Sequence, residues 1–169
     1  LNPKMAFGTG YHETTRLMLK MVADYVKADN YVIDAGTGTG VLAMAAAMMG
    51  AKEVFGFDID PWSKRNAEEN IDLNGLSGCI TVKEGDERLL KECKIADIVL
   101  ANINREVLIK ILPILSKYVK YRGNLILSGL LESDLQRTLD QPTLVDTFKL
   151  LTQNREGEWL ALAFQKTSE

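Results

Sequence analysis

The stretch YVIDAGTGTG, residues 31–40, decides the fold of this chain. Its first three residues form a short apolar run typical of a buried strand, and residues 41–49 after it have the apolar composition of a helix. Gly36, Gly38 and Gly40 make the turn between them, where glycine permits positive φ and lets a ligand approach the backbone closely. A strand, a glycine turn and a helix in this order predict a parallel α/β sheet with a ligand at the turn.

Apolar runs alternate with helical patterns from residue 31 to about residue 128, which indicates βαβ units. We expect strands at residues 31–33, 54–57, 79–82, 95–101 and 124–128, and two more near 144–151 and 159–165. We expect helices at residues 11–27, 41–49, 61–74, 105–119 (kinked or split at Pro113) and 132–139. The last two strands flank the turn-prone residues 154–157. The predicted fold is therefore α/β, with a seven-stranded, mostly parallel sheet and a C-terminal antiparallel hairpin.

The glycine spacing narrows the class of ligand. A dinucleotide turn has the pattern G-x-G-x-x-G, but counting from Gly36 its third glycine would fall at Val41. No Gly-Lys-Ser/Thr triplet follows, which excludes a P-loop. A tight turn without a phosphate cradle suits a nucleoside that carries no phosphate, and S-adenosylmethionine is such a ligand. Seven strands with an antiparallel ending describe the Rossmann-like class I S-adenosylmethionine-dependent methyltransferase fold.

An acidic residue at the end of the second strand is the next signal. Asp58 lies twenty-two positions past Gly36, and a carboxylate there can accept hydrogen bonds from both ribose hydroxyls. Asp60 is better explained as a helix N-cap, with Pro61 at the first helical position. We expect Gly36, Gly38 and Asp58 to bind the cofactor. A glycine-rich turn with an acidic strand end and no ligand is the alternative.

Asp86 follows the third strand in the sequence Glu84-Gly85-Asp86. In one interpretation its carboxylate binds the cofactor by accepting a hydrogen bond from the adenine amino group. In the other it is the N-cap of a helix that contains Arg88. The sequence leaves both interpretations open.

The fourth strand ends in Ala101-Asn102-Ile103-Asn104. In this fold that strand end faces the reacting methyl group. Methyl transfer is a direct displacement at a carbon bound to a sulfonium, so the protein mainly has to hold the nucleophile in line with the carbon–sulfur bond. We expect Asn102 to be the catalytic residue, since its carbonyl can accept a hydrogen bond from a target amine and aim the amine lone pair. The prolines of the Asn/Asp-Pro-Pro-aromatic motif of amide and adenine methyltransferases are missing here.

The composition limits other functions. The chain has 169 residues, of which 46% are hydrophobic and 25% charged, as in one globular domain. No run approaches the roughly 20 apolar residues of a membrane span. The net charge of −3 argues against a broad nucleic-acid surface and is compatible with a basic protein partner. One histidine and two cysteines, Cys79 and Cys93, leave little for a metal site, and the thiols suit a cytoplasmic protein.

The whole chain resembles the bacterial methyltransferases of ribosomal protein L11. Its most specific part is NPKMAFGTGYHETT, residues 2–15, which is similar to the AFGTGxHxTT segment of that family. The glycine turn, FDIDP (residues 57–61), ANI (101–103), LSGL (127–130) and Glu158-Trp159 occur in the order and spacing of the family.

The resemblance implies N-methylation of lysine side chains and an N-terminal amine of a large-subunit ribosomal protein, with S-adenosylmethionine as the methyl donor. It also implies cofactor contacts for Thr15, Gly36, Asp58 and Asn102. Full-length members of the family carry an N-terminal substrate-binding domain joined by a linker. By this resemblance, residues 1–169 are the methyltransferase catalytic domain without that N-terminal domain.

Two roles near the N-terminus stay open. Phe7 and Gly8 are candidates for a flap over the methyl group, or for a disordered terminus. His12 is a candidate pocket residue next to the methionine end of the cofactor, or a surface residue in the first turn of a helix.

The chain departs from the family pattern at Tyr11, Glu13, Thr37, Thr39 and Asn104. These departures leave the cofactor expectation intact and the target more open. Two alternative functions remain, because a fold does not decide a substrate. One is a methyltransferase that acts on RNA or a small molecule, and the other is a non-catalytic domain that binds S-adenosylmethionine.

Overall fold

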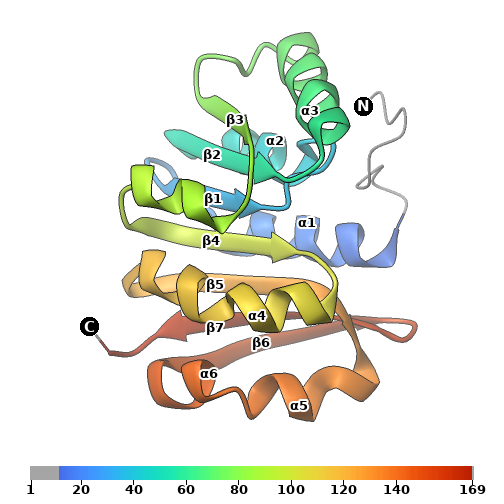
Figure 1. Ribbon diagram of the computed structural model, residues 1–169, viewed down its shortest axis with the longest axis vertical. Coiled ribbons are helices and arrows are strands. Elements are labelled where there is room, and N and C mark those ends of the chain that lie inside the picture. Colours follow the sequence, from blue (N-terminus) through green and yellow to red (C-terminus); the bar gives the residue numbers. More distant parts are fainter. Residues whose placement is uncertain (1–11, 169) are drawn as a thin grey trace.

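Seven strands form one mixed sheet with helices on both faces (Figure 1). The computed structural model describes residues 12–168. The strands are β1 (Tyr31–Ala35), β2 (Glu53–Asp58), β3 (Ile80–Glu84), β4 (Ala96–Asn102), β5 (Val119–Leu131), β6 (Phe148–Glu156) and β7 (Trp159–Lys166). Their order in the sheet is β3-β2-β1-β4-β5-β7-β6. Strands β1 to β5 pair in parallel, and β7 is antiparallel to both β5 and β6. The predicted seven-stranded sheet with its antiparallel ending is confirmed.

The helices cover the two faces of the sheet. They are α1 (Glu13–Tyr25), α2 (Val41–Met48), α3 (Pro61–Leu73), α4 (Arg105–Leu115), α5 (Leu135–Leu139) and α6 (Pro142–Thr147), with the short 3₁₀ turns η1 (Glu87–Glu92), η2 (Ser116–Tyr118) and η3 (Glu132–Asp134). One hydrophobic core packs α1, α2 and α3 against one face, and a second packs α4 and α6 against the other. The central strand β1 contributes to both cores and is buried along its whole length. In β4, the continuous apolar run at residues 98–101 is buried as predicted.

Helix starts follow the predicted capping residues. Asp60 accepts a hydrogen bond from the backbone N–H of Trp62 at 3.1 Å, and Pro61 occupies the first turn of α3. The break expected at Pro113 is not observed within α4, which continues two residues past it to Leu115 and passes into η2. A proline near the end of a helix removes one hydrogen bond where few turns remain to be disturbed.

The boundaries of the C-terminal elements were predicted wrongly. The strand expected at residues 144–151 begins at Phe148, because Pro142 starts the short helix α6, on which Leu144 is buried and Val145 is 65% exposed. The hairpin turn is also tighter than residues 154–157, since pairing with β7 continues as far as Glu156. Strand β5 likewise extends beyond residues 124–128 at both ends.

Two features of the sheet shape the pocket side and the outer edge. The pairing of β5 with β7 shifts register between Ser128 and Leu130, so Gly129 forms a β-bulge. At one edge, β6 carries the exposed side chains Lys149 and Arg155. The helices built from residues 12–168 all fall short of the length and hydrophobicity that a membrane span needs.

Candidate functional site

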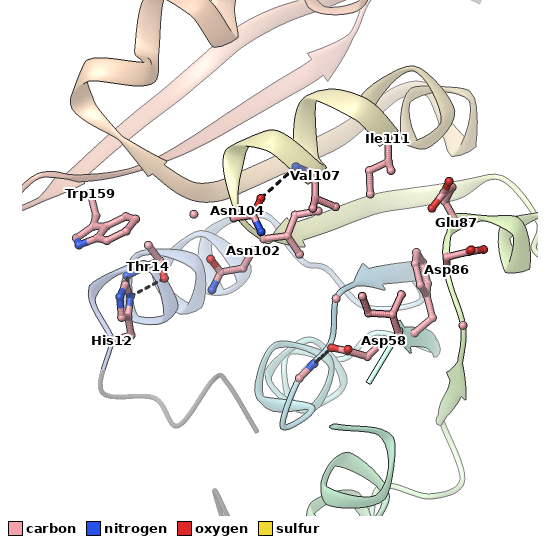
Figure 2. Close-up of a pocket in the computed structure, with 17 residues that line it drawn as sticks. His12, Thr14, Asp58, Asp86, Glu87, Asn102, Asn104, Val107, Ile111 and Trp159 are labelled. Atoms are coloured by element: carbon pink, nitrogen blue, oxygen red, sulfur yellow. Dashed lines mark hydrogen bonds between the residues drawn. The ribbon is translucent and has the colours of Figure 1, made fainter. Parts of the chain in front are cut away.

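A pocket of about 480 Å³ lies at the carboxyl ends of β1, β2, β3, β4 and β5 (Figure 2). Its volume is within the range of about 300–1,000 Å³ usual for small-molecule sites. The strand order reverses between β1 and β4, so the pocket sits at the switch point where open α/β sheets bind ligands. Within residues 12–168, no three His, Cys, Asp or Glu side chains are grouped as metal ligands.

The glycine turn after β1 forms one wall of the pocket. Gly36 and Gly38 line it, with φ of +72° and +56°. The backbone N–H groups of Gly36 and Thr37 both donate to the carbonyl of Phe57, at 2.9 and 3.0 Å, which ties the turn to β2. A Cβ on Gly36 would overlap the side chain of Ile103, so only glycine allows the turn to lie this close to the end of β4.

Asp58, the last residue of β2, lies beside this turn and lines the pocket. Its Oδ2 accepts a hydrogen bond from the N–H of Gly38 at 2.9 Å, drawn in Figure 2, and its Oδ1 accepts one from the N–H of Asp60 at 3.0 Å. Each carboxylate oxygen has two lone pairs, so both can accept a further hydrogen bond from a ligand. The backbone therefore orients the carboxylate before any ligand binds.

Asp86 both caps a helical turn and lines the pocket. Its Oδ1 accepts hydrogen bonds from the backbone N–H of Arg88 at 3.0 Å and from its Nε at 2.8 Å, which hold the pKa of Asp86 below its ordinary value. Of the two interpretations of Asp86, the N-cap is confirmed. Asp86 lies with Glu87 and Ile111 toward one end of the pocket (Figure 2). A contact with an adenine amino group stays a prediction.

Asn102 ends β4 at the pocket and is only 9% exposed. Its Oδ1 is closed off from solvent and has no hydrogen-bond partner among the described residues. The neighbouring Asn104 differs, since its Oδ1 caps α4 by accepting from the N–H of Val107 at 3.1 Å. An unpaired buried amide oxygen costs about 1–3 kcal/mol, a cost that a donor group on a bound ligand would offset.

His12, Thr14 and Trp159 line the pocket on the same side as Asn102 (Figure 2). The Nδ1 of His12 accepts the N–H of Thr14 at 3.2 Å and caps α1, and its ring meets Trp159 edge-on with 5.0 Å between centroids. His12 is thus a pocket residue as well as a helix cap. Thr15 is fully buried and is not among the residues that line the pocket. Its neighbour Thr14 lines the pocket. The candidates Phe7 and Gly8 lie outside the described residues.

Sequence reasoning gave no pocket role to Ile103, Val107, Ile111, Gly129 or Trp159, all of which line it. The spacing of four between Val107 and Ile111 is a signal that one face of α4 covers a site. Trp159 stood out in the sequence only as part of the Glu158-Trp159 motif of the resemblance, and the pairing of β7 with β5 is what places it opposite the end of β5.

A buried carboxyl group lies beneath the glycine turn. Asp34 is 1% exposed, and burial raises its pKa to about 6, against the opposing hydrogen bond that the hydroxyl of Thr37 donates at 2.7 Å. The negative charge of Asp58 raises the pKa further. The turn therefore lies over a group that titrates near neutral pH.

The chain matches the family model described as "Ribosomal protein L11 methyltransferase (PrmA)" over residues 1–167. It is 42% identical to the ribosomal protein L11 methyltransferase of Streptococcus mutans over 168 residues, which are 99% of this chain and 52% of that protein. The chain thus spans about half the length of the curated relatives that it matches.

Solved structures agree with this match. The crystal structure of a ribosomal protein L11 methylase from Lactobacillus delbrueckii subsp. bulgaricus superposes with a TM-score of 0.88 at 32% identity, covering 99% of this chain and 84% of that one. An RNA methyltransferase from Salinibacter ruber, solved with S-adenosyl-L-homocysteine, shares the fold with a TM-score of 0.65 at 19% identity, over 90% of this chain and 89% of that one. The fold is that of Rossmann-like methyltransferases, and this chain belongs to the ribosomal protein L11 methyltransferase family.

Proposed function

We propose that this chain transfers methyl groups from S-adenosylmethionine to amine nitrogens of ribosomal protein L11, on lysine side chains and the N-terminal amine. Family membership supports the substrate class. The observation that carries the chemistry is Asn102, whose buried carboxamide oxygen has no partner among the described residues. An amine is a hydrogen-bond donor that such an oxygen could accept from.

The charge and the glycine wall of the pocket support this cofactor. Asp58, Asp86 and Glu87 line it, and the described lining residues include no lysine or arginine. A ligand with a positive sulfonium and no phosphate suits that lining. Gly36 and Gly38 line the pocket without side chains, so a ligand can lie directly against the backbone of the turn. When bound, S-adenosylmethionine supplies an activated methyl group on a good leaving group.

Each of the site residues has a separate role in this proposal. Asp58 holds the ribose hydroxyls, Gly36 and Gly38 allow contact with the backbone, and Asp86 accepts from the adenine amino group. Asn102 accepts a hydrogen bond from the incoming amine and turns its lone pair toward the methyl carbon. The amine must be neutral to react, and lysine has an ordinary pKa of about 10.4, so we expect the rate of transfer to rise with pH.

The 169 residues make up the catalytic domain in this proposal, since they contain the complete seven-stranded sheet and its pocket. Because the proposed substrate is a ribosomal protein, we propose that the reaction takes place in the cytoplasm.

Two measurements test the function. Isothermal calorimetry of the purified chain should detect binding of S-adenosylmethionine and of S-adenosylhomocysteine. Incubation with S-adenosylmethionine labelled in the methyl group should transfer label to purified ribosomal protein L11 and not to ribosomal RNA. Label on RNA alone would show that the substrate assignment is wrong. Failure to bind either nucleoside at millimolar concentration would refute the function as a whole.

A further inference from the structure

Two loops meet beside Asn102, one after β4 and one after β5. Asn102 itself lies opposite Ser128 in the register of these strands. Beyond it, the first loop continues to Arg105, where α4 begins. The second is called a loop although it begins within β5, and it runs from the bulge at Gly129 through η3 to Asp134. The position of the Asn102 carboxamide depends on how these two loops are held together.

An inner contact joins the loops at Ile103, the residue after Asn102. Gly129 has φ of +82°, and a Cβ placed on it would overlap the carbonyl oxygen of Ile103 and lie 2.7 Å from its carbonyl carbon. On the opposite side, the side chain of Ile103 fills the space where Gly36 has no Cβ. Ile103, the residue after Asn102, is therefore packed between two glycines, with its side chain against Gly36 and its backbone against Gly129. This contact is tight but carries no hydrogen bond between these residues among those described.

An outer contact joins the loops through an ion pair. Nη1 of Arg105 donates to Oδ1 of Asp134, and Oδ2 of Asp134 accepts the N–H of Leu131 at 3.0 Å. Asp134 is 6% exposed, and the side chain of Arg105 is 33% exposed. Burial opposes the ionisation of Asp134, yet the hydrogen bonds from Arg105 and Leu131 outweigh it and keep its pKa below the ordinary value. Both carboxylate oxygens are thus committed to holding the second loop and the start of α4.

We propose that Arg105 and Asp134 are positioning residues that clamp the β4 and β5 loops together and so hold Asn102 in the orientation needed for transfer. This inference rests on the proposed function. Arg105 follows Asn102 by three residues. Releasing it frees the outer end of a short loop whose inner end carries the amide, and displacement of a reacting group by about 1 Å can cost about 100-fold in rate.

The chain offers a matched control for this clamp. Arg155 pairs with Glu132 in the same second loop, but this pair joins the loop to β6 and does not touch the β4 loop. Asp134→Asn keeps the size of the side chain and an oxygen for the N–H of Leu131 while removing the charge that binds Arg105. Glu132→Gln makes the same chemical change in the control pair. Arg105→Lys keeps a positive charge and should retain part of the clamp.

The first readout needs no turnover. Asn102→Ala identifies the side-chain amide resonances of Asn102 in a ¹⁵N-correlated NMR spectrum by their disappearance. Asp134→Asn should shift or broaden these resonances, Arg105→Lys should do so less, and Glu132→Gln should leave them unchanged. Unchanged Asn102 resonances in Asp134→Asn would overturn the clamp, whether or not the chain proves to be a methyltransferase.

The second readout is a double-mutant cycle on methyl transfer to ribosomal protein L11. Asp134→Asn should lower kcat by about ten-fold or more while changing the calorimetric Kd for S-adenosylhomocysteine by less than about two-fold. Added to Asn102→Ala, the same change should have little further effect on kcat, because the group that it positions is gone. If the loss of kcat in the double variant equalled the product of the two single losses, Asp134 would have a merely structural role. An equal loss of kcat in Glu132→Gln and Asp134→Asn would show the same. A wild-type chain that binds no nucleoside would refute the proposed function and leave the NMR result to decide the clamp.

Discussion

At the scale of single residues, Asp58 does two things with one carboxylate. It holds the glycine turn through Gly38 and the start of α3 through Asp60, and it faces the pocket. A group fixed in this way loses little freedom when a ligand binds, which favours affinity.

Asp58→Ala should weaken S-adenosylmethionine binding by about ten-fold to 100-fold, since hydrogen bonds to a charged group contribute about 1.5–3 kcal/mol each. Calorimetry measures the Kd, and circular dichroism checks that the fold survives. Asp60→Asn is the control, because the side chain of Asp60 caps α3 and is not in the pocket lining. Equal affinities for wild type and Asp58→Ala would show that the ribose is held elsewhere.

Asp34 predicts a dependence of stability on pH. Its pKa rises from 3.8 to about 6 on folding, so the native state binds this proton more tightly than the unfolded chain does. The resulting stabilisation is present below pH ~4 and is lost as the pH rises through ~6, by about 3 kcal/mol. Asp34→Asn imitates the protonated form, so its unfolding free energy relative to wild type should increase from pH 4 to pH 7. Urea titrations across this range measure the difference, and parallel curves would contradict the prediction.

At the scale of elements, the bulge in β5 sets the geometry on one side of the pocket. Strand alternation places Leu125 and Leu127 on the α4 face, and by alternation Leu130 would face the other way. The extra residue Gly129 returns Leu130 to the α4 core and also brings the strand against Ile103.

Gly129→Ala should therefore lower the free energy of unfolding by more than the backbone strain of an alanine at positive φ would alone. The matched control is Gly157→Ala in the β6–β7 turn, where φ is +59° and a Cβ would meet nothing within 4 Å. We expect Gly129→Ala to cost about 1–3 kcal/mol more than Gly157→Ala, because overpacking adds to backbone strain. Denaturant unfolding of the two variants gives the difference, and equal losses would mean that the contact with Ile103 relaxes freely.

Local patterns in the sequence predicted what local physics determines. The glycine turn and the N-cap at Asp60 follow from residues a few positions apart. The N-cap at Asp86 was one of two interpretations that the sequence left open, and the structure confirms it. Local patterns could not show that Thr14 lines the pocket and Thr15 does not. Which of the two faces the pocket depends on how α1 is rotated on the sheet.

Contacts between segments far apart in the sequence determine the features that local patterns did not predict. Trp159 reaches the pocket because its strand pairs with the end of β5, opposite Leu131. Leu144 and Val145 were predicted to begin a strand. They lie in the short helix α6 instead, because Pro142 starts a helix there and only Leu144 faces the core.

At the scale of the whole molecule, the pocket lies where five parallel strands end and both cores meet. A ligand there contacts segments that are far apart in the sequence. It therefore stabilises the folded chain as a unit and not one loop alone.

Saturation with S-adenosylhomocysteine at about 100 times its Kd should add about 2.7 kcal/mol of stability. For a chain of this size that corresponds to a rise in Tm of about 5–10 °C. Differential scanning calorimetry measures it. NAD, a dinucleotide whose pyrophosphate the glycine turn is not built to hold, is the control and should leave the Tm unchanged. A comparable rise with NAD would contradict the assignment of a ligand without phosphate.

The outer edge formed by β6 has a consequence for how copies of the chain meet. The pairing of β6 with β7 shifts register between Leu150 and Thr152, so β6 is itself bulged, and its exposed cations Lys149 and Arg155 lie on opposite faces of the sheet. A bulge and exposed charged side chains on an edge strand are two ways in which proteins keep sheets from extending into neighbours. The edge strand β6 thus opposes the addition of a further strand to the sheet.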